Sequence, residues 1–239
     1  CQIDSFRRYI QKFRVEDNFV LMDFFCHSVP SMWAWEKYLH LVEQTTGKVN
    51  YASWRNKQTG WHDSWAMGID GENTAEKVNW HDSYNLLIRG KKNLVYSRFS
   101  KGDIFYNLFL NDFCCNPACQ KNCKYKYDQS SADIRIGDLW GKTYCKNEDG
   151  VSALVAFNKK GDALIQQINC ELKEHSFEVV AEGQMKKNAG TAYLSGIAWK
   201  MLHNSKPYSS TEWKWLIIAE KILQLPRKIV RKINRMISR

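Results

Sequence analysis

The chain has 239 residues, of which 44% are hydrophobic, and a formal net charge of +10. A chain of this length can bury its own core, so it does not belong with the small secreted proteins that depend on disulfides. It contains no run of about 18 uninterrupted apolar residues, so no membrane-spanning helix is expected.

The positive charge is concentrated near the C-terminus. Residues 221–239 hold seven basic residues and no acidic one, which leaves 28 basic against 25 acidic residues in the rest of the chain. Because that body is nearly neutral and shows no basic stripe with interleaved aromatic residues, no nucleic-acid partner is expected. With eight cysteines and no export signal, the chain is expected in a reducing cytoplasm.

The N-terminal region predicts a helix, a strand and a second helix. Residues 2–13 carry apolar side chains at helical spacing, and the continuous apolar run 19–25 predicts a buried central strand. Cys26 and His27 follow its carboxyl end, where open α/β sheets bind their ligands, and Ser31 leads into the next helix. Cys26 is a candidate metal ligand or a buried core thiol. His27 is a candidate ligand, a proton relay or a hydrogen-bonded structural histidine.

Residues 49–95 are turn-rich and strand-like, and predict an antiparallel meander or hairpin excursion attached to the sheet. The tryptophans of this region are Trp54, Trp61, Trp65 and Trp80. Ser100, with Asp103 three residues later, predicts the cap of a helix over 104–109 that leads into a cysteine-rich loop.

Four of the eight cysteines, Cys114, Cys115, Cys119 and Cys123, fall within ten residues. Such a loop can present several sulfur atoms to one centre, which favours a metal or iron–sulfur site. Zinc sites usually consist of two well-separated CxxC pairs, so this dense spacing favours iron–sulfur over zinc. Free buried thiols and a disulfide between neighbours are the alternatives.

A second group of candidate residues follows the loop. Residues 133–136 alternate as a strand does, and Gly137-Asp138 is expected to turn into Trp140-Gly141. A glycine here lets the backbone approach a ligand closely, and Asp138 can accept a hydrogen bond from a ribityl or ribose hydroxyl. A plain β-turn with a solvated Asp138 is the alternative.

The remaining elements complete the fold class. A strand over 151–157, a helix over 158–172 and a further strand over 177–180 are predicted. We therefore predict an α/β fold: a mixed sheet flanked by helices, with an antiparallel Trp-rich excursion and a Cys-rich cluster loop. One main domain over 1–205 and a basic helical tail over 206–239 are expected, because no Pro/Gly/Ser-rich linker divides residues 1–205.

Three stretches, in order, carry a resemblance. The first is Cys1-Gln2-Ile3. The second is Asp23 to Ser31, with Trp35, Lys37, Tyr38 and Leu39. The third comprises Asn107 to Leu110, Cys114, Cys123 to Lys126, Ala132 to Ile134 and Gly137 to Gly141. Over roughly residues 1–180 the chain resembles the C-terminal domain of the coenzyme F-420 hydrogenase/dehydrogenase beta-subunit family.

The resemblance implies an iron–sulfur flavoprotein that passes electrons between a 4Fe-4S cluster, a flavin, usually FAD, and a deazaflavin or another small redox partner. By position, the implied cluster ligands are Cys1, Cys26, Cys114 and Cys123, with Cys115 and Cys119 as alternates. The candidate cofactor-binding residues are His27, Gly137, Asp138, Trp140 and Gly141. Catalytic residues stay unassigned, because the sequence holds no GxSxG, HExxH, Walker or Rossmann motif.

Members of the family often carry an N-terminal ferredoxin-like segment and a flavin-contacting part. This chain begins inside the family's signature, so we expect a fragment that would meet a ferredoxin-like domain or subunit and in which FAD binding is incomplete. Some members occur in bacterial polysaccharide gene clusters, which links the prediction to polysaccharide biosynthesis. The alternative to an enzyme is a non-catalytic binding or scaffold module with a structural zinc in the Cys-rich loop.

The C-terminal tail has its own pattern. Residues 212–225 are expected to form a helix that Pro226 interrupts, and apolar residues then recur at helical spacing among basic ones. A basic helix with an apolar stripe is typical of a segment that lies on an anionic membrane surface, so residues 211–239 predict peripheral association with the inner face of the membrane. A helix that packs on its own domain is the alternative.

Overall fold

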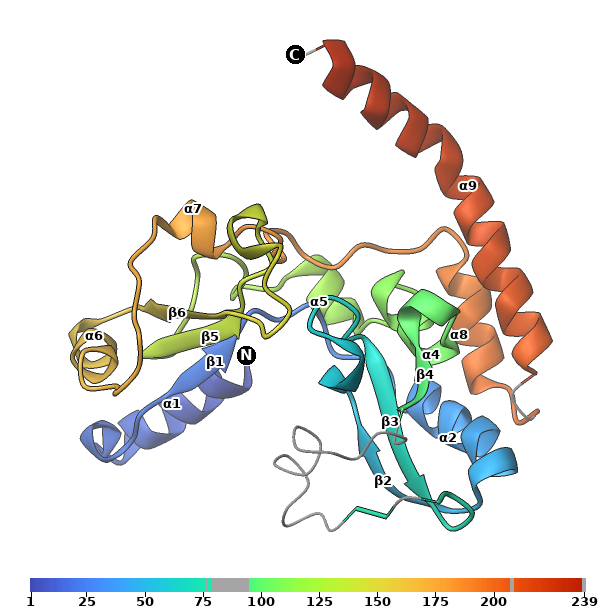
Figure 1. Ribbon diagram of the computed structural model, residues 1–239, viewed down its shortest axis with the longest axis horizontal. Coiled ribbons are helices and arrows are strands. Elements are labelled where there is room, and N and C mark those ends of the chain that lie inside the picture. Colours follow the sequence, from blue (N-terminus) through green and yellow to red (C-terminus); the bar gives the residue numbers. More distant parts are fainter. Residues whose placement is uncertain (76, 79–94, 207–208, 238–239) are drawn as a thin grey trace. The chain divides into compact units, whose positions relative to one another are not determined.

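The computed structural model describes residues 1–75, 77–78, 95–206 and 209–237 (Figure 1). The chain forms two compact units. The first comprises Cys1–Val29 and Pro117–Ala189, and the second comprises Pro30–Asn116 and Gly190–Arg239. Each unit is therefore built from two separate stretches of sequence. The predicted boundary between residues 205 and 206 stays a prediction.

The first unit contains a three-stranded mixed sheet in the order β1-β5-β6. β1 (Met22–Phe24) runs parallel to β5 (Ile134–Asp138), and β5 pairs antiparallel with β6 (Ser152–Ala156). The helices of this unit are α1 (Gln2–Lys12), α5 (Pro117–Lys121), α6 (Lys159–Ile165) and α7 (Phe177–Val180), with 3-10 turns at Glu16–Asn18 and Lys142–Tyr144. α6 and α7 both pack against β6.

The second unit contains the antiparallel sheet β2-β3-β4. Among its described residues, the strands are β2 (Val49–Ser53), β3 (Ala66–Gly71) and β4 (Val95–Arg98). The helices described there are α2 (Met32–Thr46), α4 (Ile104–Leu110), α8 (Ser195–His203) and α9 (Ser210–Ile237), with 3-10 turns at Lys57–Thr59 and Phe99–Lys101. The core lies where α2, β3 and α4 meet, and it is formed by Tyr38, Val42, Met67, Ile69, Phe105 and Tyr106.

The fold class predicted from the sequence is confirmed. A mixed sheet with helices, an antiparallel excursion that carries tryptophans, and a loop rich in cysteines are all present. Trp61 is fully buried in the excursion, whereas Trp54 is exposed at its surface. Trp80 lies outside the described residues. α1 and α2 also form where the helical spacing predicted them.

The predicted buried central strand over 19–25 is wrong in both respects. Only Met22–Phe24 forms the strand, and in the described sheet β5 is central while β1 pairs with β5 alone. Met22 and Phe24 are 46% and 63% exposed, whereas Leu21 is buried and Asp23 turns toward Arg135. The apolar run is therefore covered on one face only.

The other corrections concern element ends. Asp103, rather than Ser100, caps α4: its carboxylate accepts from the backbone N–H of Tyr106 at 2.8 Å. α6 ends at Ile165, seven residues before the predicted end, and residues 177–180 form the short helix α7 instead of a strand. α9 continues through Pro226 to Ile237. Among the described residues, no helix is long and apolar enough to cross a membrane.

Candidate functional site

The carboxyl ends of β1 and β5 share one edge of the first unit's sheet, because the two strands are parallel. Phe25 continues the pairing, since its backbone N–H donates to the carbonyl oxygen of Ile136 at 3.3 Å. Cys26 and His27 follow directly, and β5 ends at Asp138 on the same edge. The expectation that candidate ligands follow the end of a strand is thus confirmed.

A buried lysine holds the backbone that carries Cys26. Lys126 is only 9% exposed, and its Nζ donates to the carbonyl oxygens of Cys26 and His27. A buried ammonium group requires such acceptors, so these bonds fix residues 26 and 27 against the segment that follows α5. No role was predicted for Lys126 from the sequence, where its signal was its place in the run Cys123-Lys124-Tyr125-Lys126.

Three thiols of the first unit interact around this turn. Burial raises the pKa of the Cys26 thiol, Lys126 opposes this effect, and the thiolate charges of Cys119 and Cys123 raise the pKa further. Cys119 lies in α5, Cys123 follows that helix by two residues, and all three side chains are partly buried. The Cys26 thiol therefore lies within electrostatic range of Cys119 and Cys123.

Arg135 shapes the segment between α5 and β5. Its guanidinium is buried and donates to both carboxylate oxygens of Asp23 at 2.7 Å. It also donates to the carbonyl oxygens of Tyr125, Tyr127 and Gln129, at 3.2, 2.6 and 3.0 Å. One side chain thus satisfies three carbonyl groups that no regular element would pair. Sequence reasoning missed this role, although a lone arginine within an apolar strand was the available signal.

The start of α1 lies against the same segment. Cys1 precedes α1 and is exposed, and the helix's first turn carries Asp4. A hydrogen bond from Tyr125, the second residue after Cys123, is the main cause that lowers the pKa of the Asp4 carboxyl. Three residues later in α1, Arg7 pairs with Asp133 at 2.7 Å. These contacts anchor α1, which follows Cys1, to the segment that follows Cys123.

Cys114 and Cys115 belong to the second unit. Both are completely buried after α4, where the carbonyl oxygen of Cys114 accepts from the N–H of Ser31 at 2.8 Å and Cys115 forms a β-bridge with Pro30. Burial raises the pKa of the Cys114 thiol to about 12. All eight cysteines lie in the described part of the chain, and none forms a disulfide there. The remaining two, Cys145 and Cys170, are exposed.

The predicted cofactor-binding residues of the second group lie at the end of β5 and just beyond it. Gly137 and Asp138 are its last two residues, and Trp140 and Gly141 precede a 3-10 turn. A Cβ atom at Gly137 would meet Phe25 at 2.7 Å, and one at Gly141 would meet Glu182 at 2.5 Å. Both glycines therefore allow close approach of the protein's own side chains.

Residues 182–184 pack against this strand end. The carboxylate of Glu182 accepts from the backbone N–H of Lys142 at 3.0 Å, and the side-chain amide of Gln184 donates to the carbonyl oxygen of Asp138. Gly183 lies beside Trp140, where a Cβ atom would clash at 2.7 Å. At this edge of the first unit's sheet, the end of β5 is therefore held by residues 182–184, and Cys26 follows the end of the adjacent strand β1.

Comparison with known proteins identifies the family of the chain. Residues 1–179 match the family described as coenzyme F420 hydrogenase/dehydrogenase, C terminus of the beta subunit. No curated protein and no solved structure matches the chain. The matched stretch covers the whole first unit up to residue 179, including the cysteines around Cys26. The chain belongs to the coenzyme F-420 hydrogenase/dehydrogenase beta-subunit family, through its C-terminal domain.

Proposed function

We propose that this chain is the electron-transferring part of an iron–sulfur flavin oxidoreductase, with a 4Fe-4S cluster held by Cys26, Cys119, Cys123 and Cys1. One observation carries the proposal: Cys26, which follows the carboxyl end of β1, lies within electrostatic range of Cys119 and Cys123, which are far from it in the sequence. The family to which the chain belongs is named for hydrogenases and dehydrogenases, which supports redox chemistry at this edge.

The residues fit such a cluster by their chemistry. Iron–sulfur clusters are held by thiolates. Negative charge on Cys119 and Cys123 raises the pKa of Cys26, so a nearby cation is needed for all three thiols to ionise together. Lys126 provides part of that balance, since it lowers the pKa of Cys26. A bound cluster would supply one-electron transfer, while this chain's residues fix the thiols and their electrostatic surroundings.

The proposed ligand set replaces Cys114 of the set implied by the resemblance with Cys119. The Cys114 thiol is completely buried and belongs to the second unit, whereas Cys26, Cys119 and Cys123 belong to the first. Cys119 is partly exposed and interacts with Cys26. We place Cys1 fourth because the first turn of α1 contacts Tyr125, beside Cys123.

The flavin side of the proposal concerns the same edge. His27 follows Cys26, and Gly137, Asp138, Trp140 and Gly141 end or follow β5, so all five candidates lie at the carboxyl ends of two adjacent parallel strands. We propose that they face FAD, and that the electron path is completed by a ferredoxin-like domain or subunit and by a small redox partner such as a deazaflavin. A role in polysaccharide biosynthesis stays part of the proposal.

Anaerobic reconstitution with iron and sulfide tests the ligand set. We expect about four iron and four sulfide per chain and the broad visible absorption of a cubane. Cys119→Ser should lower bound iron and bleach that absorption, whereas Cys114→Ser and the exposed Cys145→Ser should retain it. Full iron in Cys119→Ser with loss in Cys114→Ser would refute the proposed set.

The same samples test the zinc alternative. A scaffold module with structural zinc would give a colourless protein that retains zinc, shows no reducible absorption and unfolds on chelation. Metal analysis of protein purified without reconstitution, followed by dithionite titration, separates the two outcomes. Bound zinc with no reducible centre would overturn the oxidoreductase proposal.

A further inference from the structure

α9 has a face that is packed within the second unit. Trp213, Leu216, Ile217 and Glu220 are all buried there, at 8% exposure or less. The carboxylate of Glu220 accepts from the backbone N–H groups of Tyr193 and Leu194, at 3.0 and 2.9 Å, and so ties α9 to the start of α8. The first part of α9 therefore packs on its own unit, as one of the two interpretations of the sequence predicted.

A second apolar face of α9 is exposed. Trp215, Ile218, Ile222 and Leu225 are 65%, 44%, 58% and 51% exposed. They follow one another at intervals of three, four and three residues, so on an α-helix they form one stripe, and the buried residues lie on the opposite side. We call these four residues the α9 stripe. In the sequence, Ile229, Ile233 and Met236 continue the same spacing.

The stripe is longer than the packed face. From Trp215 to Leu225 it extends over about 15 Å of helix, whereas the packed face ends near Glu220. In Figure 1 the second half of α9 extends past α8, the helix that covers its first half. The surface available for docking is therefore an elongated helical stripe.

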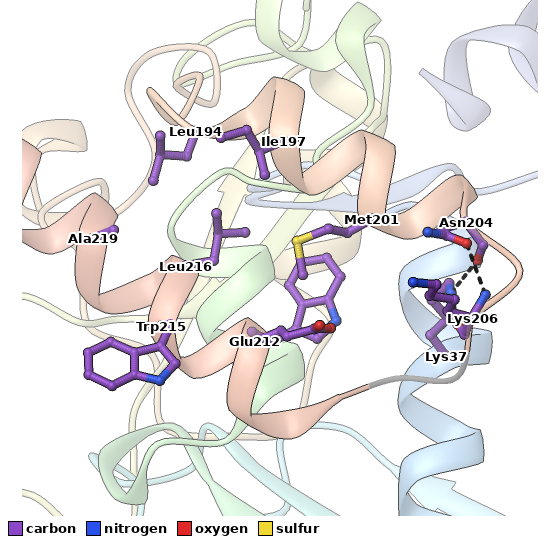
Figure 2. A pocket seen from close by; sticks show the side chains of 11 residues that line it. Lys37, Leu194, Ile197, Met201, Asn204, Lys206, Glu212, Trp215, Leu216 and Ala219 are labelled. Carbon is purple, nitrogen blue, oxygen red and sulfur yellow. Dashed lines mark hydrogen bonds between the residues drawn. The ribbon is translucent and has the colours of Figure 1, made fainter.

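A groove widens the apolar surface beside the stripe. It encloses a cavity of about 690 Å³ between α8 and α9, lined by Ile197 and Met201 of α8 and by Trp215 and Ala219 of α9. Figure 2 shows Met201 and Leu216 pointing into the space between the two helices, with Trp215 at its margin. Since Trp215 belongs to both, groove and stripe are continuous.

Cations flank this surface. At one end of the groove Lys37 donates to the carbonyl oxygens of Asn204 and Lys206, at 2.6 and 2.8 Å, so its ammonium is held in place there (Figure 2). In the sequence, residues 221–239 hold seven basic residues and no acidic one. A second copy of this helix would bring like charges together, whereas an anionic lipid surface complements them.

We propose that the α9 stripe docks on the surface of an anionic lipid bilayer. The apolar residues would enter the boundary between headgroups and acyl chains, and the basic residues would contact the headgroups. Helices that combine an apolar stripe with a basic face bind in this way without crossing the membrane. The proposal is independent of the cluster, because α9 belongs to the second unit.

Vesicle co-sedimentation of the full chain tests the proposal. We expect pelleting with phosphatidylglycerol-containing vesicles at low salt, little pelleting with pure phosphatidylcholine vesicles, and release at high salt. Ile218→Asp with Ile222→Asp should abolish pelleting, whereas Leu223→Asp, also exposed on α9 but outside the stripe, should retain most of it. Lys228→Gln with Arg231→Gln and Lys232→Gln should lower the partition coefficient on the order of a hundredfold.

The variants avoid residues that the fold requires. Removal of residues 211–239 would also delete the buried Trp213 and Leu216, so substitutions in the stripe are the cleaner test. Circular dichroism should show unchanged folding of each variant. Equal pelleting of wild type and the Ile218/Ile222 variant, or no pelleting of wild type on anionic vesicles, would overturn the proposal. A dimer that only the stripe variant loses, without vesicle binding, would overturn it in favour of self-association.

Discussion

Arg135 and Asp23 form a two-pronged ion pair in which Nε and Nη2 of the guanidinium each donate to a different carboxylate oxygen, both at 2.7 Å. The two residues lie opposite each other in the parallel register of β5 and β1. Because the same guanidinium also binds three carbonyl groups of residues 125–129, it links the strand that precedes Cys26 to the segment that follows Cys123.

Arg135→Lys should destabilise the first unit strongly. Lysine keeps the charge but cannot reproduce the planar fork, so the partly buried carboxylate of Asp23 and the three carbonyl groups lose donors. We expect the free energy of unfolding to fall by about 3 kcal/mol, measured by urea denaturation. The exposed Lys142→Met serves as control and should change it by less than about 0.5 kcal/mol. Equal stability of the two variants would contradict the role given to Arg135.

Asp133 should make stability fall in acid. Burial acts to raise the pKa of its carboxyl, but the N–H of Leu21, the amide of Asn158 and the guanidinium of Arg7 outweigh burial and lower the pKa below 3.8. A carboxyl whose pKa is lower in the folded state stabilises the fold above its ordinary pKa and loses this contribution as pH falls through the folded value.

The measurement is urea denaturation between about pH 5 and about pH 3. Over this range the free energy of unfolding should fall less steeply in Asp133→Asn than in wild type. Asp149→Asn removes an exposed carboxylate in the same unit and should follow wild type. Parallel curves for wild type and Asp133→Asn would show that other groups cause the acid dependence.

Cysteine alkylation should separate buried from accessible thiols. In metal-free, reduced protein, Cys145 and Cys170 should react readily with iodoacetamide because they are exposed. Cys114 should react slower by on the order of a thousandfold near pH 8, since its pKa of about 12 leaves little thiolate and its side chain is buried. Peptide mass spectrometry over time measures the rates. Rapid labelling of Cys114 in folded protein would exclude the buried placement.

Glu220→Ala should weaken the attachment of α9 to α8. The substitution leaves the N–H groups of Tyr193 and Leu194 without their carboxylate acceptor, and it removes a negative charge from the start of α8. We expect a loss of about 2 kcal/mol in the free energy of unfolding and faster hydrogen exchange in α9. Lys214→Ala, exposed in the same helix, should leave both unchanged.

Local patterns in the sequence predicted the helices better than the strands. The helical spacing in residues 2–12 and 32–46 reports which side each residue presents, and this is a local property. β1 depends on pairing with β5 more than a hundred residues later, so its edge position was not encoded locally. α9 continues through Pro226 because the carbonyl left without its partner, that of Ile222, belongs to an exposed residue and can bind water.

The candidate cysteine site also depends on contacts between residues that are far apart in the sequence, which local patterns do not predict. Four cysteines within ten residues indicated one centre, but the unit boundary falls after Asn116 and divides them into two pairs. Pro117 begins a new helix there, a position that proline favours. Spacing alone identified the region and the strand end at Cys26. The proposal of Cys119 in place of Cys114 depends on burial and on the unit boundary, and the roles of Lys126 and Arg135 depend on hydrogen bonds that only the folded chain forms.

The interrupted sequence of the first unit has a consequence for synthesis on the ribosome. The N–H of Leu21 bonds to Asp133, which lies 112 positions later, and residues 30–116 of the other unit are translated between them. β2, β3 and β4 are all complete before β5 emerges, so the antiparallel sheet can form first while α1 and β1 are still unpaired and Leu21 is uncovered. Nascent chains halted before residue 134 would therefore expose the apolar segment 19–25 and be prone to aggregate. Cys119 and Cys123 would also join Cys26 in the folded unit only late in translation.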